Sequence, residues 1–260
     1  MRCNIEQCVA KCNTCLGVII YYDQSEFDIR CEWGLHGIQT LAPISDVVII
    51  VDVLSFTTCV DIAVSNGATI FPYRFKDESA VEFAKSKSAL LAGSRRDTMA
   101  EYSLSPASMT TVSGGTKLVL PSPNGSTLTL STGNTLTIAG CLRNCQAVAE
   151  YAATAGNAIA VIPAGEKWED GAGLRPAIED LIGAGAIISF MKSEKSPEAL
   201  IAQAAFEAAK SNIFKLLSSC SSGKELIERG FVEDVKLAAK FNCSTAVPML
   251  KSGGYYLKYC

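Results

Sequence analysis

The chain has 260 residues, of which 48% are hydrophobic and 19% are charged, and its formal net charge is -3. These values are ordinary for a globular enzyme, and a weakly acidic chain without a lysine or arginine run argues against a nucleic-acid or anionic-membrane partner. Because no apolar run reaches the roughly 18 residues of a membrane span and the N-terminus lacks the pattern of a secretion signal, we expect a cytoplasmic protein.

Cysteines are concentrated at the start of the chain. Of the 11 cysteines, four lie within the first fifteen residues, namely Cys3, Cys8, Cys12 and Cys15, and the last three have the CxxxCxxC spacing of some iron–sulfur sites. No strand pattern precedes this motif and no repeated strand–helix pattern of barrel length follows it, which disfavours a cluster. A labile zinc site is an intermediate alternative. We interpret residues 1–15 as an N-terminal extension or a mistaken start, and the scattered later cysteines as reduced thiols.

Predicted strands and helices alternate over the first two thirds of the chain. The expected strands are 16–22, 47–53, 69–73, 117–120, 135–139 and 158–163. The expected helices are 57–65, 79–87, 142–153, 177–191, 198–217, 223–229 and 233–241. The segment 31–44, which contains the single histidine His36, is expected to be a loop. This order predicts an α/β layered fold with parallel strands, formed by one compact domain over residues 16–260.

The ends of four predicted strands indicate where a site would lie. Strands that end near residues 53, 120, 139 and 162 deliver their loops to one edge of the sheet, and open α/β sheets bind ligands at that edge. Asp52 ends the fully apolar run VVIIVDV. It could cap the helix that follows or bind a metal ion, and its position at a sheet edge favours the metal.

Three polar segments near strand ends could bind an anion. The turn at 121–127 combines small polar side chains with a glycine before a predicted helix, as anion cradles do, but plain surface turns have the same composition. The arginine pair within 93–96 could contribute one phosphate-binding guanidinium. An arginine and an asparagine likewise stand at the start of a predicted helix, at 143–144. The candidate residues in these segments are Arg95, Asn124, Gly125, Ser126, Arg143 and Asn144.

The segment 166–180 is the most acidic part of the chain. It holds five carboxylates beside a Gly-Ala-rich run: Glu166, Glu169, Asp170, Glu179 and Asp180. Crowded carboxylates repel one another unless solvent or a cation relieves them. Oxygen ligands with one histidine in the whole chain fit Mg²⁺ better than Zn²⁺ or iron. Since adjacent helical residues diverge by about 100°, Glu179 and Asp180 need not bind the same ion.

An ordered set of motifs over about residues 45 to 250 resembles the 2-phosphosulfolactate phosphatase family. The motifs are VDVLSFTTCVDIAVSNGATIFPY (51–73), LLAGSRR (90–96), LSPAS (104–108), LPSPNGST (120–127), AGCLRN (139–144), AIEDLIGAGAII (177–188), GFVEDV (230–235) and VPML (247–250). The resemblance implies a three-layer α/β/α fold of two related subdomains, here roughly 16–145 and 146–260. It also implies a Mg²⁺-dependent phosphatase that converts 2-phosphosulfolactate to 3-sulfolactate, a precursor of coenzyme M.

The resemblance carries over to individual residues. It matches the aspartate that ends the first motif strand, the Asn-Gly turn, the asparagine that opens the next helix and the Glu-Asp pair, which are here Asp52, Asn124, Gly125, Asn144, Glu179 and Asp180. Four motifs depart from the family. The usual arginine after Asp-Val-Leu is Ser55, Gly-Glu-Arg is Gly-Ser-Arg at 93–95, Asn-Ser-Pro is Leu-Ser-Pro at 104–106, and Thr-Thr-Asn-Gly is Ser-Pro-Asn-Gly at 122–125. Arg143 or Arg175 could replace the missing charge.

These observations predict Mg²⁺-assisted hydrolysis of a small anionic phosphate monoester. The expected catalytic and metal-binding residues are Asp52, Glu179 and Asp180, and the expected substrate-binding residues are Arg95, Asn124, Gly125, Ser126, Arg143 and Asn144. Attack by water and attack by Asp52 both remain open. The alternatives are a non-catalytic anion-binding or structural member of the same fold and a redox role for the N-terminal cysteines. The sequence also leaves a homo-oligomer open.

Overall fold

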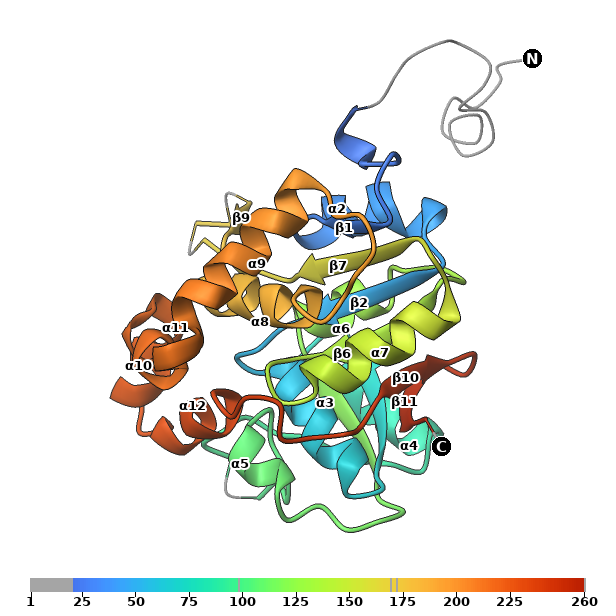
Figure 1. Cartoon of the computed structure of the whole chain (residues 1–260). Coiled ribbons are helices and arrows are strands. Elements are labelled where there is room, and N and C mark those ends of the chain that lie inside the picture. Colours follow the sequence, from blue (N-terminus) through green and yellow to red (C-terminus); the bar gives the residue numbers. More distant parts are fainter. Residues whose placement is uncertain (1–20, 98, 169, 172, 260) are drawn as a thin grey trace, which may run out of the picture.

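A nine-stranded mixed sheet forms the centre of the computed structural model, which describes residues 21–97, 99–168, 170–171 and 173–259. Helices cover both faces of the sheet (Figure 1), so the predicted three-layer α/β/α fold is confirmed. In sheet order the strands are β1 (Ile29–Cys31), β7 (Ile159–Pro163), β2 (Val47–Val51), β6 (Leu136–Gly140), β10 (Pro248–Lys251), β11 (Tyr255–Lys258), β3 (Thr69–Tyr73), β5 (Lys117–Pro121) and β4 (Leu90–Leu91).

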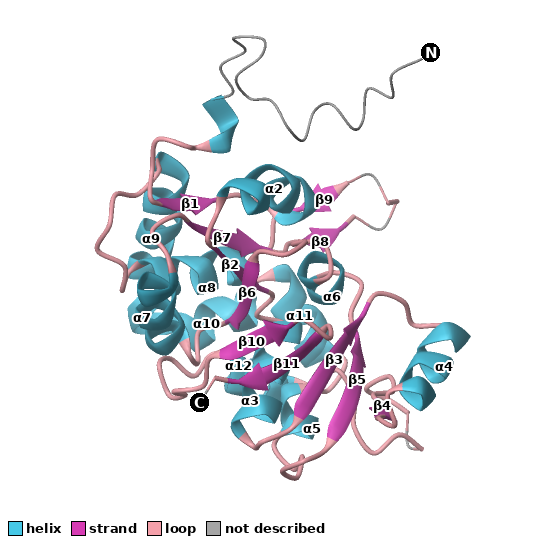
Figure 2. Ribbon diagram, turned by 90° about the vertical axis from the view of Figure 1, so that its right-hand side faces the viewer, coloured by secondary structure: helices cyan, strands magenta, loops and turns pink. Residues whose placement is uncertain are grey.

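The sheet consists of two parallel groups joined by an antiparallel hairpin. The strands β1, β7, β2 and β6 are parallel to one another, as are β3, β5 and β4. The hairpin β10–β11 lies between the groups and pairs with each through a single residue pair, Met249 with Ile138 and Tyr256 with Ile70. Figure 2 shows the two groups inclined differently around this hairpin. Such sparse pairing lets the sheet bend at the joint, so that loops from both groups can meet.

The helices follow the strands in the predicted order. They are α2 (Gly34–Leu41), α3 (Phe56–Ser65), α4 (Glu78–Ser86), α5 (Pro106–Met109), α6 (Gly125–Thr129), α7 (Cys145–Ala155), α8 (Ile178–Ile188), α9 (Pro197–Ala209), α10 (Ile213–Ser219), α11 (Ser221–Glu228) and α12 (Val232–Ala238). Three 3₁₀ turns are η1 (Tyr21–Asp23), η2 (Ala42–Ile44) and η3 (Lys210–Asn212), and a separate two-stranded hairpin joins β8 (Glu166–Lys167) to β9 (Leu174–Arg175).

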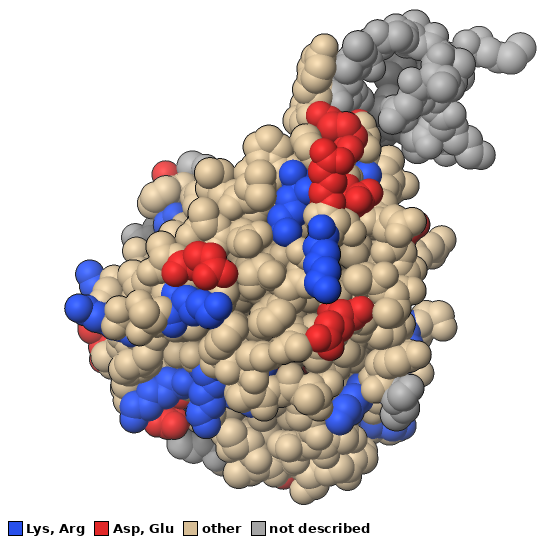
Figure 3. All heavy atoms as spheres, viewed as in Figure 1, with Lys and Arg blue, Asp and Glu red and all other residues tan. Residues whose placement is uncertain are grey.

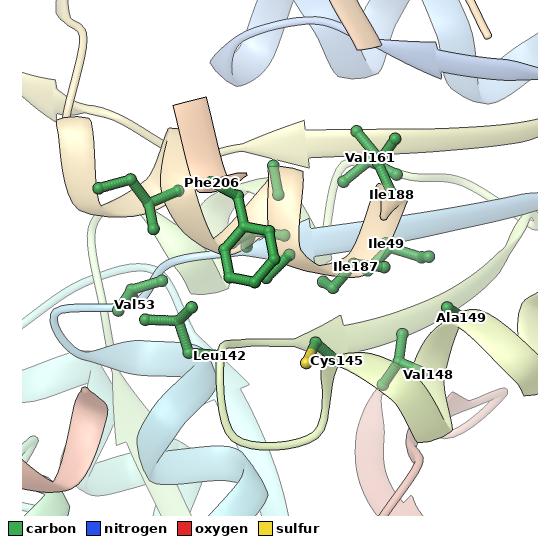
Figure 4. Packing of buried hydrophobic residues seen from close by; sticks show 14 of the residues in the cluster. Ile49, Val53, Leu142, Cys145, Val148, Ala149, Val161, Ile187, Ile188 and Phe206 are labelled. Atoms are coloured by element: carbon green, nitrogen blue, oxygen red, sulfur yellow. The ribbon is translucent and has the colours of Figure 1, made fainter. Parts of the chain in front are cut away.

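The central strand β2 explains why the chain forms layers. All five of its residues are buried, and successive side chains point to opposite faces of a strand. Ile49 and its alternate neighbours pack into a cluster with α7, α8 and α9, whereas Ile50 and Val48 pack against α2 and α6. Figure 4 shows Ile49 in the first cluster, together with Ile187 of α8 and Phe206 of α9. The continuous apolar run is therefore the signature of a strand with two covered faces.

Close packing of α8 on α9 depends on a small residue. A methyl group at Gly185 would lie 1.9 Å from the carbonyl oxygen of Ala202, so no larger side chain fits there without moving a helix. Gly185 belongs to the apolar run of α8 that follows the acidic segment. The packing holds the start of α8, with its two carboxylates, at a fixed position below the sheet edge.

Several predicted elements differ from the structure. The segment 31–44 is not a loop, because it contains the end of β1 and the helix α2, whose buried positions Gly34, Gly37, Ile38 and Leu41 follow helical spacing. His36 is exposed on this helix. The helix expected at 198–217 is interrupted by η3, and the one expected at 142–153 begins three residues later, at Cys145. The hairpin β10–β11 was not predicted.

Other predictions lie partly or wholly outside the described residues. The N-terminal cysteines and most of the expected strand 16–22 are outside them, and the described part, Tyr21–Asp23, is a 3₁₀ turn. The six described cysteines are free thiols, four of them buried, as expected for reduced cysteines. Within the described ranges no helix is long and apolar enough to cross a membrane. On the face shown in Figure 3, basic and acidic side chains are interspersed on a mostly uncharged surface. The subdomain division near residue 145 stays a prediction.

Candidate functional site

Asp52 lies directly after β2, where the sheet edge meets the start of α3. Its side chain is 7% exposed, and each carboxylate oxygen accepts a backbone N–H bond, Oδ1 from Phe56 at 3.1 Å and Oδ2 from Gly125 at 2.9 Å. Gly125 follows β5, a strand of the other parallel group. The predicted convergence of strand ends is thus confirmed for β2 and β5, and a carboxylate joins them.

This contact explains why residue 125 is a glycine. A Cβ atom there would lie 2.3 Å from Cδ1 of Phe56 and 2.7 Å from Oδ2 of Asp52, so a side chain would separate the two loops. The N–H group of Gly125 already donates to Asp52. The expectation that this N–H binds a phosphoryl oxygen is therefore not supported, because a carboxylate of the protein occupies it.

Asp180 ties together two further loops of the same edge. Its Oδ1 accepts the N–H of Val53 at 2.8 Å and its Oδ2 accepts the N–H of Gly165 at 2.9 Å, which links the loops after β2 and β7 to the first turn of α8. Burial raises the pKa of Asp180 well above its usual range, and the charges of Asp52 and Glu179 add to the rise. Glu179 is 2% exposed. The three predicted carboxylates are therefore close enough to repel one another.

Glu166, one of the five carboxylates of the acidic segment 166–180, is a fourth member of this group. It lies on β8, half-buried, and its Oε2 accepts a bond from the Asn124 side-chain amide at 2.8 Å. Burial raises the pKa of Glu166 to about 7, and the charge of Asp52 contributes to the rise. Glu166 was not among the expected site residues, yet the β8–β9 hairpin holds it against the Asn-Gly turn. Glu169 lies outside the described residues.

Burial and mutual repulsion also raise the pKa of Asp52, to about 6. Burial is the main cause, the N–H donors of Phe56 and Gly125 oppose it, and the charge of Glu179 adds to it. Carboxylates with raised pKa values in one cleft are typical of functional sites. The group is therefore poised to gain a cation or a proton.

A cavity of about 930 Å³ opens beside these carboxylates. Asp52, Asn124 and Glu166 line one part of it, and the rest of the wall carries the basic side chains Lys76, Arg95, Lys167, Arg175 and Arg229. Trp168 and the first residues of α11 also line it. The cavity thus places acidic groups that could hold a metal ion next to basic groups that could hold an organic anion.

Lys76 is a cavity residue that the sequence did not suggest. It follows β3, and burial lowers its pKa, with the nearby charge of Arg95 acting in the same direction. A clue was available, because the strand that ends at Tyr73 continues into the basic sequence Arg74-Phe75-Lys76 at the same sheet edge.

Arg95 is held at the cavity wall from three sides. Its Nε donates to Oδ2 of Asp234 at 2.9 Å, its Nη2 donates to the Ser55 hydroxyl at 2.6 Å, and its guanidinium lies 5.6 Å from the ring centre of Phe231. Asp234 is itself 1% exposed and also accepts the N–H of Ala107 at 3.0 Å. The fixed guanidinium lines the cavity, as expected for a substrate-binding arginine.

Three predicted substrate-binding side chains have internal partners instead. Arg143 donates to Asp61 at 2.8 Å, Asn144 is fully buried and bonds to the backbone of residues 139, 141 and 246, and the buried Ser126 hydroxyl donates to the carbonyl of Leu120. None of the three lines the cavity. For these residues the structure supports a structural role, because their polar groups are used within the fold.

The carboxylates suit a loosely held Mg²⁺ ion better than a closed protein cage. Among the described residues, no three Asp, Glu, His or Cys side chains come together as a metal-binding group. Mg²⁺ commonly uses one or two carboxylates and completes its shell with water and substrate phosphate. Asp52 and Glu166 line one cavity and could supply such a pair, so the chemistry of the donors fits this mode of binding.

Comparison with known proteins finds the same enzyme name for the family model and for several relatives over most of the chain. The family model described as 2-phosphosulpholactate phosphatase matches residues 36–253. The chain is 33% identical to the probable 2-phosphosulfolactate phosphatase of Carboxydothermus hydrogenoformans, over 77% of this chain and 84% of that protein. It is 29% identical to the 2-phosphosulfolactate phosphatase of Methanothermobacter thermautotrophicus, over 80% and 88% of the two chains. A probable enzyme of the same name from Thermotoga maritima is 27% identical, over 84% and 96%.

Proposed function

Since the chain belongs to the 2-phosphosulfolactate phosphatase family, we propose that it hydrolyses a small phosphate monoester with a second anionic group, 2-phosphosulfolactate being the first candidate. The products would be 3-sulfolactate and phosphate, and the reaction would then supply a coenzyme M precursor. One observation carries the proposal, namely a single cavity in which Asp52 and Glu166 stand next to Arg95 and Lys76. The printed names of the relatives support the same substrate.

In this proposal the basic side chains bind the substrate and the carboxylates act on the reacting end. The Arg95 guanidinium has a fixed plane, and planar guanidinium groups recognise phosphate and sulfonate oxygens through paired donors. Lys76 adds a second positive charge from the loop after β3. Together they would neutralise a dianion that the carboxylates would otherwise repel.

Asp52, with Glu166, would hold Mg²⁺, and the buried Glu179 in the first turn of α8 would add negative charge near the ion. Bound there, the ion would neutralise phosphate charge and favour attack on phosphorus. The two N–H bonds to Asp52 would fix the direction of its remaining lone pairs. Asp180 would hold two loops of the sheet edge in position, because its oxygens accept the backbone N–H groups of Val53 and Gly165. This assigns Asp180 a positioning role in place of the metal-binding role expected from the sequence.

Phosphate release from 2-phosphosulfolactate, with and without Mg²⁺, is the direct test. We expect turnover with Mg²⁺ and its loss in EDTA, and a drop in kcat of at least about 100-fold for Asp52→Asn. Ser126→Ala is a matched control, since Ser126 lies next to Gly125 but bonds to Leu120 outside the cavity. Unchanged turnover in Asp52→Asn would remove the basis for this assignment.

A non-catalytic anion-binding protein is the second candidate. It is favoured by the engagement of Arg95, whose Nε and Nη2 atoms both donate to side chains of the protein. A guanidinium whose N–H groups already donate to protein side chains stabilises a developing negative charge less than one whose N–H groups are available to the substrate. Thermal stabilisation by the phosphate ester without any release of phosphate would favour this candidate.

A further inference from the structure

The first turn of α11 forms part of the cavity wall that the proposed function does not use. Ser221 and Ser222, the first two residues of this helix, line the cavity together with Glu225 and Arg229 of the same helix. The helix has eight residues and packs beside α10 (Figure 1). Its N-terminus is therefore open to a bound molecule from one side and supported by protein on the other.

Ser222 carries a buried hydroxyl that has no partner. The residue is 5% exposed, and its Oγ makes no hydrogen bond to any described residue. Leaving a buried hydroxyl unpaired is unfavourable, so such groups are uncommon and call for an explanation. Because Ser222 belongs to the cavity wall, an oxygen atom of a ligand could accept the missing bond.

The backbone at the same place also has donors to spare. The N–H groups of Gly223 and Lys224 both donate to Cys220, the first to its sulfur at 3.4 Å and the second to its carbonyl at 2.9 Å. No bond from the N–H groups of Ser221 and Ser222 occurs within the described part of the chain. Unpaired N–H groups and the helix dipole give a helix N-terminus affinity for anions.

The surrounding charges set the kind of anion. Arg95 and Arg229 line the same cavity, although Arg229 also pairs with Glu225 on the exposed face of α11. Glu179 and Asp180 are acidic neighbours of this helix start: the pKa of the Cys220 thiol is raised to about 12, mainly by burial and then by the charge of Glu179, with a smaller effect of Asp180. A ligand here would therefore need several acceptor oxygens, and a nearby cation would have to balance its charge against these carboxylates. A tetrahedral oxyanion on a larger substrate supplies the oxygens, and Arg95 supplies the cation.

We propose that the Ser222 hydroxyl and the first N–H groups of α11 bind one tetrahedral oxyanion of the substrate, a phosphoryl or a sulfonate group. The identity of the substrate rests on the proposed function, whereas oxyanion binding at α11 does not. The site lies in the wall that also carries Arg95. A substrate with two anionic ends would thus meet Arg95 and the α11 N-terminus in one cavity, which would select against phosphate esters with an uncharged second end.

Direct binding to the full chain tests the site without requiring turnover. Isothermal titration calorimetry with inorganic phosphate and, separately, with ethanesulfonate would compare the wild type with Ser222→Ala. We expect at least a tenfold loss of affinity for one of the two anions, since a hydrogen bond to a charged group is lost. The anion that loses affinity identifies which end of the substrate binds at α11.

Ser218→Ala is the matched control. Ser218 also has a buried hydroxyl without a partner, but it lies on α10 and does not line the cavity. Both substitutions should leave the melting temperature unchanged or slightly higher, and only Ser222→Ala should weaken binding. Ser222→Asp, which places a negative charge at the site, should lower the affinity for the same anion further. The melting temperatures confirm that the variants are folded.

The outcomes separate this site from the proposed function. Equal affinities of the wild type, Ser222→Ala and Ser222→Asp for both anions would overturn the site, as would the absence of any binding to the wild type. If the wild type releases no phosphate from 2-phosphosulfolactate but Ser222→Ala still loses anion affinity, the proposed function fails and the site stands. If Ser222→Ala instead hydrolyses 2-phosphosulfolactate at the wild-type rate with an unchanged KM, the proposed function stands and the site at α11 fails.

Discussion

Two arginine–aspartate pairs in this protein share one geometry and differ in their surroundings. Arg95 donates to Asp234 at 2.9 Å and Arg143 donates to Asp61 at 2.8 Å, each through Nε. The first arginine side chain is 20% exposed and lines the cavity, whereas the second is 13% exposed and its Nη1 bonds to the carbonyl of Leu237. An arginine can therefore be a binding group or an internal tie, and whether its guanidinium lines the cavity separates the two roles.

The internal pair should give the largest loss of stability when it is broken. Asp61→Asn leaves the Arg143 charge buried without its counter-ion, which costs about 3–5 kcal/mol. The change is measured as the free energy of unfolding in urea. The phosphatase activity per folded molecule should stay at the wild-type level, because neither residue lines the cavity. A fall in activity without a fall in stability would place Arg143 back in the site.

Breaking the cavity pair should affect binding more than folding. Asp234→Asn removes the charge that orients Arg95 but leaves an acceptor oxygen for the N–H of Ala107. We expect KM to rise about tenfold with a smaller change in kcat, and stability to fall by about 1–2 kcal/mol, because the freed guanidinium can reach solvent in the cavity. Steady-state kinetics checks the prediction, and Asp61→Asn serves as its control. Equal kinetics for Asp234→Asn and the wild type would contradict it.

The carboxylate Glu166 extends the comparison to pH. Its pKa of about 7 in the fold exceeds the ordinary value of 4.5, so its contribution to stability is complete below pH 4.5 and is lost as the pH rises through about 7. Glu166→Gln should thus raise the free energy of unfolding at pH 8 by about 1–2 kcal/mol, after discounting for partial exposure. At pH 4.5 the variant and the wild type should be equal. Urea unfolding in EDTA at both pH values measures the difference.

A solvent-exposed ion pair should give the smallest change in the free energy of unfolding. Lys236 and Glu233 lie three residues apart on α12 at 3.2 Å, and both side chains are more than half exposed. Glu233→Gln should change the free energy of unfolding by less than about 0.5 kcal/mol, because water and salt screen the pair. A change comparable to that of Asp61→Asn would mean that burial does not control the strength of these pairs.

The sequence predicted the parts of the site that depend on local patterns. The apolar run before Asp52 indicated a buried strand, and an acidic residue at its end marked the sheet edge. Asp180 was found because carboxylates preceded an apolar helix. Both residues lie where expected, although their backbone bonds could not be foreseen. Local pattern and motif order were therefore sufficient for the scaffold and for its central carboxylates.

The remaining site residues depend on contacts that are distant in the sequence. Glu166 is fixed by Asn124, 42 residues earlier, through a hairpin with strands of two residues each. Ser222 is conspicuous because a partner is missing in three dimensions, which no pattern records. Arg143 appeared to be an anion binder because it opens a helix, but the fold supplies Asp61 from α3. The hairpin β10–β11 did have a signal, since the turn sequence Ser-Gly-Gly at 252–254 separates its strands.

The hairpin β10–β11 also bears on how the chain is made. Every other strand precedes residue 248 in the sequence, yet β6 and β3 gain their second neighbours only when this hairpin arrives. During synthesis, both parallel groups would therefore leave the ribosome with an open edge strand, the kind of edge that pairs with other chains. The last strands to be translated close both edges at once, so the nascent chain would depend on chaperones or on rapid completion to avoid aggregation.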